Sequence, residues 1–156
     1  MPDVRSSIFS VAYISHMLVL LGSTAMSFGL MALGVLCIAA PQFSSKMYGL
    51  PLAKLSDTGG KSEGIPWVDV VGLRDFCIGV GGLAFFLCQP KALRIYVPVV
   101  ALVPAGDAVL TISWGGLITG WLTHLFGVVS LGTLAVATWL DPSLDELPKK
   151  QALLPL

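Results

Sequence analysis

Charged residues are scarce in this chain of 156 residues. Aspartate, glutamate, lysine and arginine make up 12% of it, and their formal charges cancel at pH 7. An average soluble domain carries about twice that fraction. This scarcity excludes the basic patch that a nucleic-acid partner requires. Asparagine is absent, so the chain has no N-glycosylation site. The length allows one domain.

Patterns that bind metals or cofactors are missing as well. The three cysteines (Cys37, Cys77 and Cys88) show no C-x-x-C spacing. No H-x-x-x-H or E-x-x-H pair is present either. Gly60-Lys61-Ser62 does not end a phosphate-binding loop, because Leu55 stands where the pattern needs glycine. We therefore expect no metal and no redox cofactor.

Long apolar runs dominate instead. Hydrophobic residues make up 55% of the chain, and the mean hydropathy is +0.85. Four segments, 11–40, 67–87, 93–114 and 117–140, reach the length of about 20 residues that crosses a bilayer. The N-terminus does not match a signal peptide, since its apolar run is too long. The sequence predicts an all-α four-helix transmembrane bundle over residues 1–140, with a long polar loop at 44–65.

The connections and termini complete this predicted topology. A polar tail, residues 141–156, should be poorly ordered. Lysines and arginines slightly favour both termini in the cytoplasm, and we expect a multi-pass protein of the endoplasmic reticulum. Pro98 and Pro104 should kink the third span. Small residues on the first two spans should allow close helix packing, and those on the first leave homodimerisation open.

Five ionisable residues interrupt the apolar spans: Asp69, Arg74, Asp75, Asp107 and His124. A charge in hydrocarbon costs several kcal/mol, so such residues usually face a bundle interior and function there. From the rise per residue, Asp75 lies about 12 Å deep, and Asp107 and His124 about 10 Å deep, on the long-loop side. This common depth predicts a shared polar pocket opening toward the long loop.

These residue types can carry acid–base chemistry. Arg74 can keep one carboxylate ionised through a bidentate pair, while burial favours the protonated form of a second. Asp75 or Asp107 would then donate a proton, and His124 would act as base or relay. The alternative is purely structural: Arg74 pairs with Asp75 or Asp107 only to stabilise the bundle.

A lipophilic substrate would need an apolar wall and a few polar contacts. The candidates for that wall and those contacts are Asp69, Trp67, Phe76, Thr111, Trp114 and Trp121. The three tryptophans also fit an interfacial aromatic belt, which is the more frequent role for such residues. Asp69 lies close enough to the interface to reach water. We expect His16 to be an interfacial residue and not a ligand.

Three stretches together resemble a known family. They are Pro41-Gln42-Phe43 with Tyr48-Gly49-Leu50-Pro51, then Gly72-Leu73-Arg74-Asp75-Phe76, and then Gly106-Asp107 with His124. The pattern is similar to the small fungal integral-membrane family catalogued as domain of unknown function 4267. The resemblance covers most of the chain. It implies a four-helix membrane bundle, a role beside fungal natural-product biosynthesis, and Arg74, Asp75, Asp107 and His124 as the positions to carry over.

Taken together, we expect a membrane-embedded, cofactor-independent enzyme. It would cyclise or isomerise a lipophilic polyketide or terpenoid intermediate in secondary-metabolite biosynthesis. The alternatives are a non-catalytic scaffold and a binding or carrier subunit of such a pathway. Catalysis requires the titratable side chains, whereas a scaffold requires only its outer surface and loops.

Overall fold

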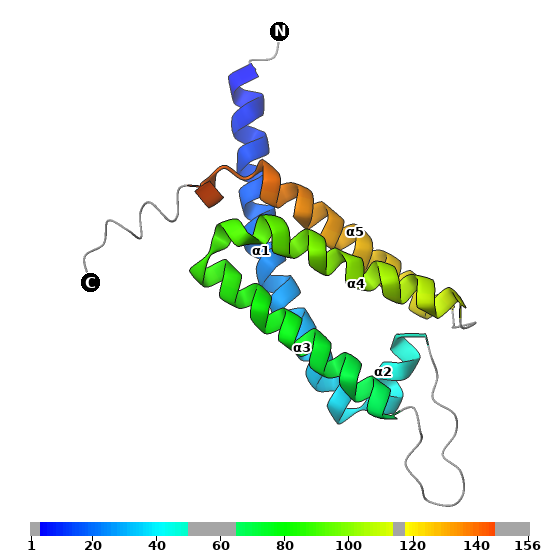
Figure 1. The fold of residues 1–156 in the computed structure, drawn as a ribbon. Helices are drawn as coiled ribbons and strands as arrows, with labels where there is room; N and C mark the ends of the chain where they lie inside the picture. The colour runs from blue at the N-terminus through cyan, green and yellow to red at the C-terminus, as the bar shows by residue number, and fades with distance from the viewer. Residues whose placement is uncertain (1–3, 50–64, 114–117, 146–156) are drawn as a thin grey trace, which may run out of the picture.

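The computed structural model of the chain describes residues 4–49, 65–113 and 118–145, and within this part it contains helices and no strand. The helices are α1 (Val4–Ala39), α2 (Pro41–Met47), α3 (Ile65–Cys88), the short 3-10 helix η1 (Pro90–Ala92), α4 (Leu93–Ser113) and α5 (Ile118–Leu140). Figure 1 shows α1 beside α3, and α4 beside α5. The predicted all-α bundle of four long helices is therefore confirmed.

The four long helices are apolar enough to cross a membrane. The candidate spans are Val11–Ala39, Trp67–Cys88, Pro90–Ser113 and Gly120–Leu140. Large apolar side chains on every long helix are exposed, and hydrocarbon is the medium that suits such a surface. These helices define an integral multi-pass membrane protein whose environment is a lipid bilayer.

Small residues bring α1 and α3 close together. A Cβ added to Gly79 would lie 2.5 Å from the carbonyl oxygen of Ser27, and one added to Gly72 would lie 2.6 Å from the Cβ of Cys37. Only glycine permits this approach of two helix backbones, as the small-residue stripe predicted. The apolar core lies nearer the other end of α1, where Val19 and Met26 pack with Leu93 and Val97.

Two expectations about the ends of the spans were wrong. Residues 44–47 belong to α2 and not to a polar loop: Pro41 starts this second helix, and Ser44 and Ser45 are buried. The tail is not loose at its beginning, because Asp141 and Leu144 are buried. Residues 114–117 and most of the long loop lie outside the described residues.

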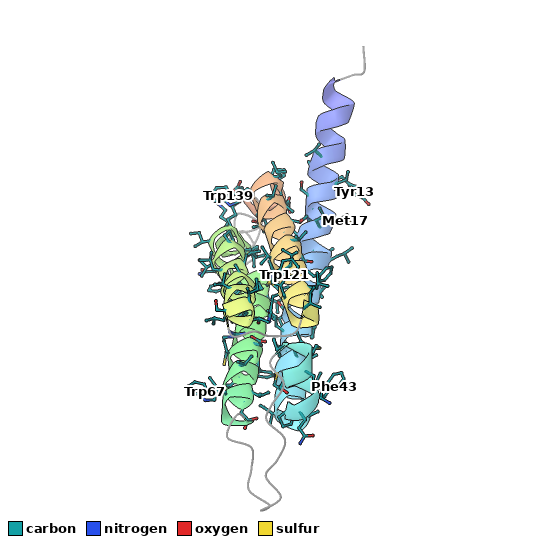
Figure 2. All side chains as sticks on the ribbon, turned by 90° about the vertical axis from the view of Figure 1, so that its right-hand side faces the viewer. Tyr13, Met17, Phe43, Trp67, Trp121 and Trp139 are labelled. Atoms are coloured by element: carbon teal, nitrogen blue, oxygen red, sulfur yellow. The ribbon has the colours of Figure 1, made fainter. Side chains whose placement is uncertain are left out.

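Aromatic residues mark both ends of the bundle. Figure 2 shows Trp67 and Phe43 near one end and Tyr13 and Trp139 near the other, and all four side chains are largely exposed. Exposed tryptophan and tyrosine gather at membrane–water interfaces. The positions of these residues are consistent with an aromatic belt at each end.

Candidate functional site

The polar cluster consists of Tyr48, Arg74, Asp75, Asp107 and His124, and it joins four elements of the bundle. Arg74 and Asp75 lie on α3, Asp107 on α4 and His124 on α5. Tyr48 directly follows α2 as its C-cap. The predicted gathering of ionisable groups from three spans is thus found in the structure.

Arg74 interacts with both aspartates. Its Nη1 and Nη2 donate to the two carboxylate oxygens of Asp107 at 3.1 and 2.9 Å. Its Nε donates to Asp75 Oδ1 at 3.0 Å. Because all three guanidinium nitrogens face carboxylate oxygens, the fork geometry of arginine is fully used. The sequence left open which carboxylate Arg74 binds, and the structure shows that it binds both.

Tyr48 completes the coordination of Asp75. Its hydroxyl donates to Asp75 Oδ2 at 2.5 Å, so each oxygen of this carboxylate accepts a hydrogen bond. Asp75 is only 4% exposed. Burial is the largest cause that raises the pKa of Tyr48 above its ordinary value, and the negative charge of Asp75 and its hydrogen bond add to it. The phenol therefore keeps its proton beside a buried carboxylate.

His124 reaches the polar cluster through Tyr48. The two rings stack with centroids 5.6 Å apart, and His124 Nε2 lies 3.4 Å from the backbone carbonyl oxygen of Tyr48. A carbonyl oxygen only accepts, so this contact assigns the ring hydrogen to Nε2. Nδ1 then carries the free lone pair, and it forms no hydrogen bond with the described part of the chain.

The groups of the polar cluster show what this arrangement can do. One guanidinium donates to two carboxyl groups, and the His124 ring stacks on Tyr48. The polar cluster thus contains a phenol that bears a proton, a carboxylate that accepts it, and an imidazole within ring contact. Proton donors, proton acceptors and a fixed cation in an apolar surrounding are the components of acid–base catalysis.

The other predicted site residues are more dispersed. Thr111 is buried, and Phe76, Asp69 and Trp121 are half-buried. Asp69 forms no ion pair or hydrogen bond with the residues that the structure describes. Trp67 is 73% exposed, which favours the belt alternative for its indole. Trp114 lies outside the described residues.

Tyr48 was missing from the predicted site. It stands outside the apolar runs, and hydropathy alone gives no reason to place it beside Asp75. The signal that could have identified it is the Tyr48-Gly49 pair directly after a short helix that begins at Pro41. A tyrosine next to a turn can reach back into a bundle when the preceding helix packs on it.

A second group, the terminal cluster, lies at the opposite end of the spans and consists of His16, Arg94, Asp141, Ser143 and Asp145. His16 Nδ1 lies 3.2 Å from Asp141 Oδ2 and 2.9 Å from Ser143 Oγ. Arg94 donates to both oxygens of Asp145 and to the backbone carbonyls of Thr138 and Asp141. These bonds satisfy carbonyls at the end of α5 and fasten the following segment. They explain why residues 141–145 are ordered.

Neither of the two best-defined surface hollows among the described residues contains a member of the polar cluster. One, of about 340 Å³, lies between α1 and α5 near Ile14 and Val136. The other, of about 420 Å³, is lined by Ala40, Pro41, Gln42 and Phe43. Within the described ranges, no three His, Cys, Asp or Glu side chains are placed to hold a metal ion.

The chain matches a known family model. A family model described as Domain of unknown function (DUF4267) matches residues 27–140. The chain belongs to this family, and the matched region contains the whole polar cluster, whereas His16 lies before it. No curated protein and no solved structure matches the chain.

Proposed function

We propose that the polar cluster is the acid–base site of a membrane-embedded enzyme that cyclises or isomerises a lipophilic small molecule. The observation that carries this proposal is the hydrogen bond from the Tyr48 hydroxyl to Asp75, whose other oxygen is held by Arg74. A proton donor and a proton acceptor are thereby paired at a buried carboxyl group. Intramembrane ionisable residues are rare and usually functional.

In this mechanism, Tyr48 is the proton donor. The sequence suggested Asp75 or Asp107 for that role, but oxygens of both accept hydrogen bonds from Arg74, whereas the Tyr48 hydroxyl donates one. Tyr48 would protonate an oxygen or an unsaturated carbon of the substrate. Asp75 would remove a proton elsewhere, directly or with His124 as relay, and would return it to Tyr48 across their hydrogen bond. Such a cyclisation or isomerisation returns every proton and changes no oxidation state, so it needs no cofactor.

The surroundings suggest the substrate class. The helices that carry the site expose apolar faces, which favours a lipophilic intermediate as substrate. The resemblance to a family that accompanies fungal natural-product genes makes a polyketide or terpenoid the first candidate. In this proposal the protein resides in the endoplasmic reticulum with both termini in the cytoplasm, and a homodimer is compatible with the small exposed residues of α1.

A second candidate function is a non-catalytic scaffold or a binding or carrier subunit. The observation that favours it is the complete pairing of Arg74, together with hollows that lie away from the polar cluster. In that case the ion pairs only join helices. The two candidates differ in one respect: catalysis needs the titratable atoms, whereas a scaffold needs only the fold.

The experiment that separates them is metabolite profiling of a host that expresses the wild type, Asp107→Ala or His124→Ala. Protein abundance and membrane insertion are measured in parallel, and Asp145→Ala at the opposite end serves as the matched control. The enzyme proposal expects a product to vanish and a precursor to accumulate in the first two variants only. An unchanged profile with normally inserted variants would instead support the scaffold.

A further inference from the structure

The turn at Tyr48 and Gly49 rests directly on the first turns of α5. A Cβ added to Gly120 would lie 2.3 Å from the Cα of Gly49 and 2.6 Å from the carbonyl oxygen of Tyr48. These are backbone atoms, which cannot rotate aside as the end of a flexible side chain can. Any residue larger than glycine at position 120 would therefore push the turn away from α5.

The turn itself is fixed from the other side. Tyr48 N–H donates to Ser44 O at 2.9 Å, and Gly49 N–H donates to Lys46 O at 3.1 Å. Gly49 has φ 79°, a backbone conformation that favours glycine. The turn is thus tied to α2 by hydrogen bonds and to α5 by close contact, and it has little freedom to shift without losing one of them.

The contact lies beside the functional groups. His124 follows Gly120 by one helical turn on α5, and its Nε2 faces the same Tyr48 carbonyl oxygen. The Tyr48 ring stacks on His124, and its hydroxyl donates to Asp75. A displacement of the turn would therefore change both the stacking and the Tyr48–Asp75 hydrogen bond.

We propose that Gly120 is a positioning residue of the acid–base site, because its missing side chain lets the Tyr48–Gly49 turn seat on α5. This inference rests on the proposed function for its catalytic meaning, but the seat itself can be measured without any substrate. In this view α5 contributes two things to the polar cluster: the His124 side chain, and a glycine at position 120 that lets the turn pack against the helix backbone.

The test compares Gly120→Ala with Gly132→Ala in protein labelled with ¹³C at tyrosine Cζ. Gly132 is a matched control on the same helix, since a Cβ added there meets nothing within 4 Å. Tyr48→Phe identifies the Tyr48 resonance. We expect that resonance to move in Gly120→Ala and to stay in place in Gly132→Ala. Product formation should fall by about tenfold to a hundredfold in Gly120→Ala only, since small misplacements of catalytic groups have effects of that size.

The outcomes separate the inference from the proposed function. An unmoved Tyr48 resonance in Gly120→Ala, or an equal shift in Gly132→Ala, would overturn the inference alone. Full product formation in Tyr48→Phe would overturn the proposed function and with it the catalytic meaning of the seat. If Gly120→Ala does not fold, Gly49→Ala strains the same turn through its φ of 79°, and an unmoved Tyr48 resonance there would also overturn the inference.

Discussion

Arg74 on α3 binds the carboxylate of Asp107 on α4 through two parallel hydrogen bonds of 2.9 and 3.1 Å. The two helices belong to different packed pairs, because α3 packs mainly on α1 and α4 mainly on α5. The ion pair therefore links the two halves of the bundle. The side chains of Arg74 and Asp107 are 33% and 21% exposed, so the ion pair is partly buried.

Replacing Arg74 with methionine should destabilise the protein by about 2–4 kcal/mol, because two partly buried carboxylates lose their cation. The double variant Arg74→Met/Asp107→Leu should be more stable than Arg74→Met alone, since it removes one of the uncompensated charges. Thermal unfolding in detergent micelles measures both. A double variant no more stable than Arg74→Met would contradict this coupling. If the site is catalytic, the double variant should recover part of the lost stability but should remain inactive.

Close packing of α1 on α3 should depend on the absence of a side chain at Gly79. Gly79→Ala should lower the unfolding temperature, because the new Cβ would meet the Ser27 carbonyl oxygen and the backbone of Met31. Gly29→Ala is the matched control: nothing lies within 4 Å of an added Cβ there. Alanine at that position should stabilise the helix by about 0.5–1 kcal/mol. Equal effects of the two substitutions would mean that α1 and α3 do not pack in this way.

The spans were predictable from the sequence because apolar runs of that length have few alternatives. The proximity of Arg74, Asp75 and Asp107 was predictable as well. Opposite charges at the same depth in an apolar bundle are stable only when they pair. The role of Tyr48 was not, since its partner Asp75 lies 27 residues away in the sequence and beyond the long loop. Sequence periodicity carries no information about such a contact.

The terminal cluster shows the same limit. His16 and Asp141 are 125 residues apart, and neither residue type nor spacing connects them. The polar composition of the tail predicted an unstructured segment. In the structure, Arg94 donates hydrogen bonds to the Thr138 carbonyl oxygen and to the Asp145 carboxylate. The hydrogen bonds that Arg94 donates therefore hold the start of this polar segment against the bundle.

Asp145 should make stability depend on pH in the acid range. Hydrogen bonds from Arg94 are the largest cause that lowers the pKa of this carboxyl below its ordinary 3.8. The folded state thus binds the proton less tightly than the unfolded state. The contribution of ionised Asp145 to the free energy of unfolding is therefore fully present above about pH 3.8. It disappears as pH falls through the lowered pKa of the folded state. Unfolding temperatures between about pH 5 and 2 should fall more steeply in the wild type than in Asp145→Asn, and identical curves would contradict this linkage.

Cysteine labelling tests the proposed orientation. Cys88 is exposed at the end of α3, on the side of the terminal cluster, whereas Cys37 is buried. In a Cys77→Ala background, a membrane-impermeant maleimide should label Cys88 only after the membrane that encloses the cytoplasm is permeabilised. Adding Cys88→Ala should abolish the labelling. Labelling that appears only after the membrane of the endoplasmic reticulum is also permeabilised would place the termini on the other side.

The most direct test of the acid–base site is product formation by Tyr48→Phe, which removes one oxygen atom and keeps the ring that stacks on His124. Tyr13→Phe is the matched control, because Tyr13 is 66% exposed near the other end of the bundle. Removing a general acid should lower product formation by about 10²- to 10⁴-fold, while Tyr13→Phe should match the wild type. If folded Tyr48→Phe forms product at the wild-type level, the polar cluster is not a catalytic site that depends on the Tyr48 proton.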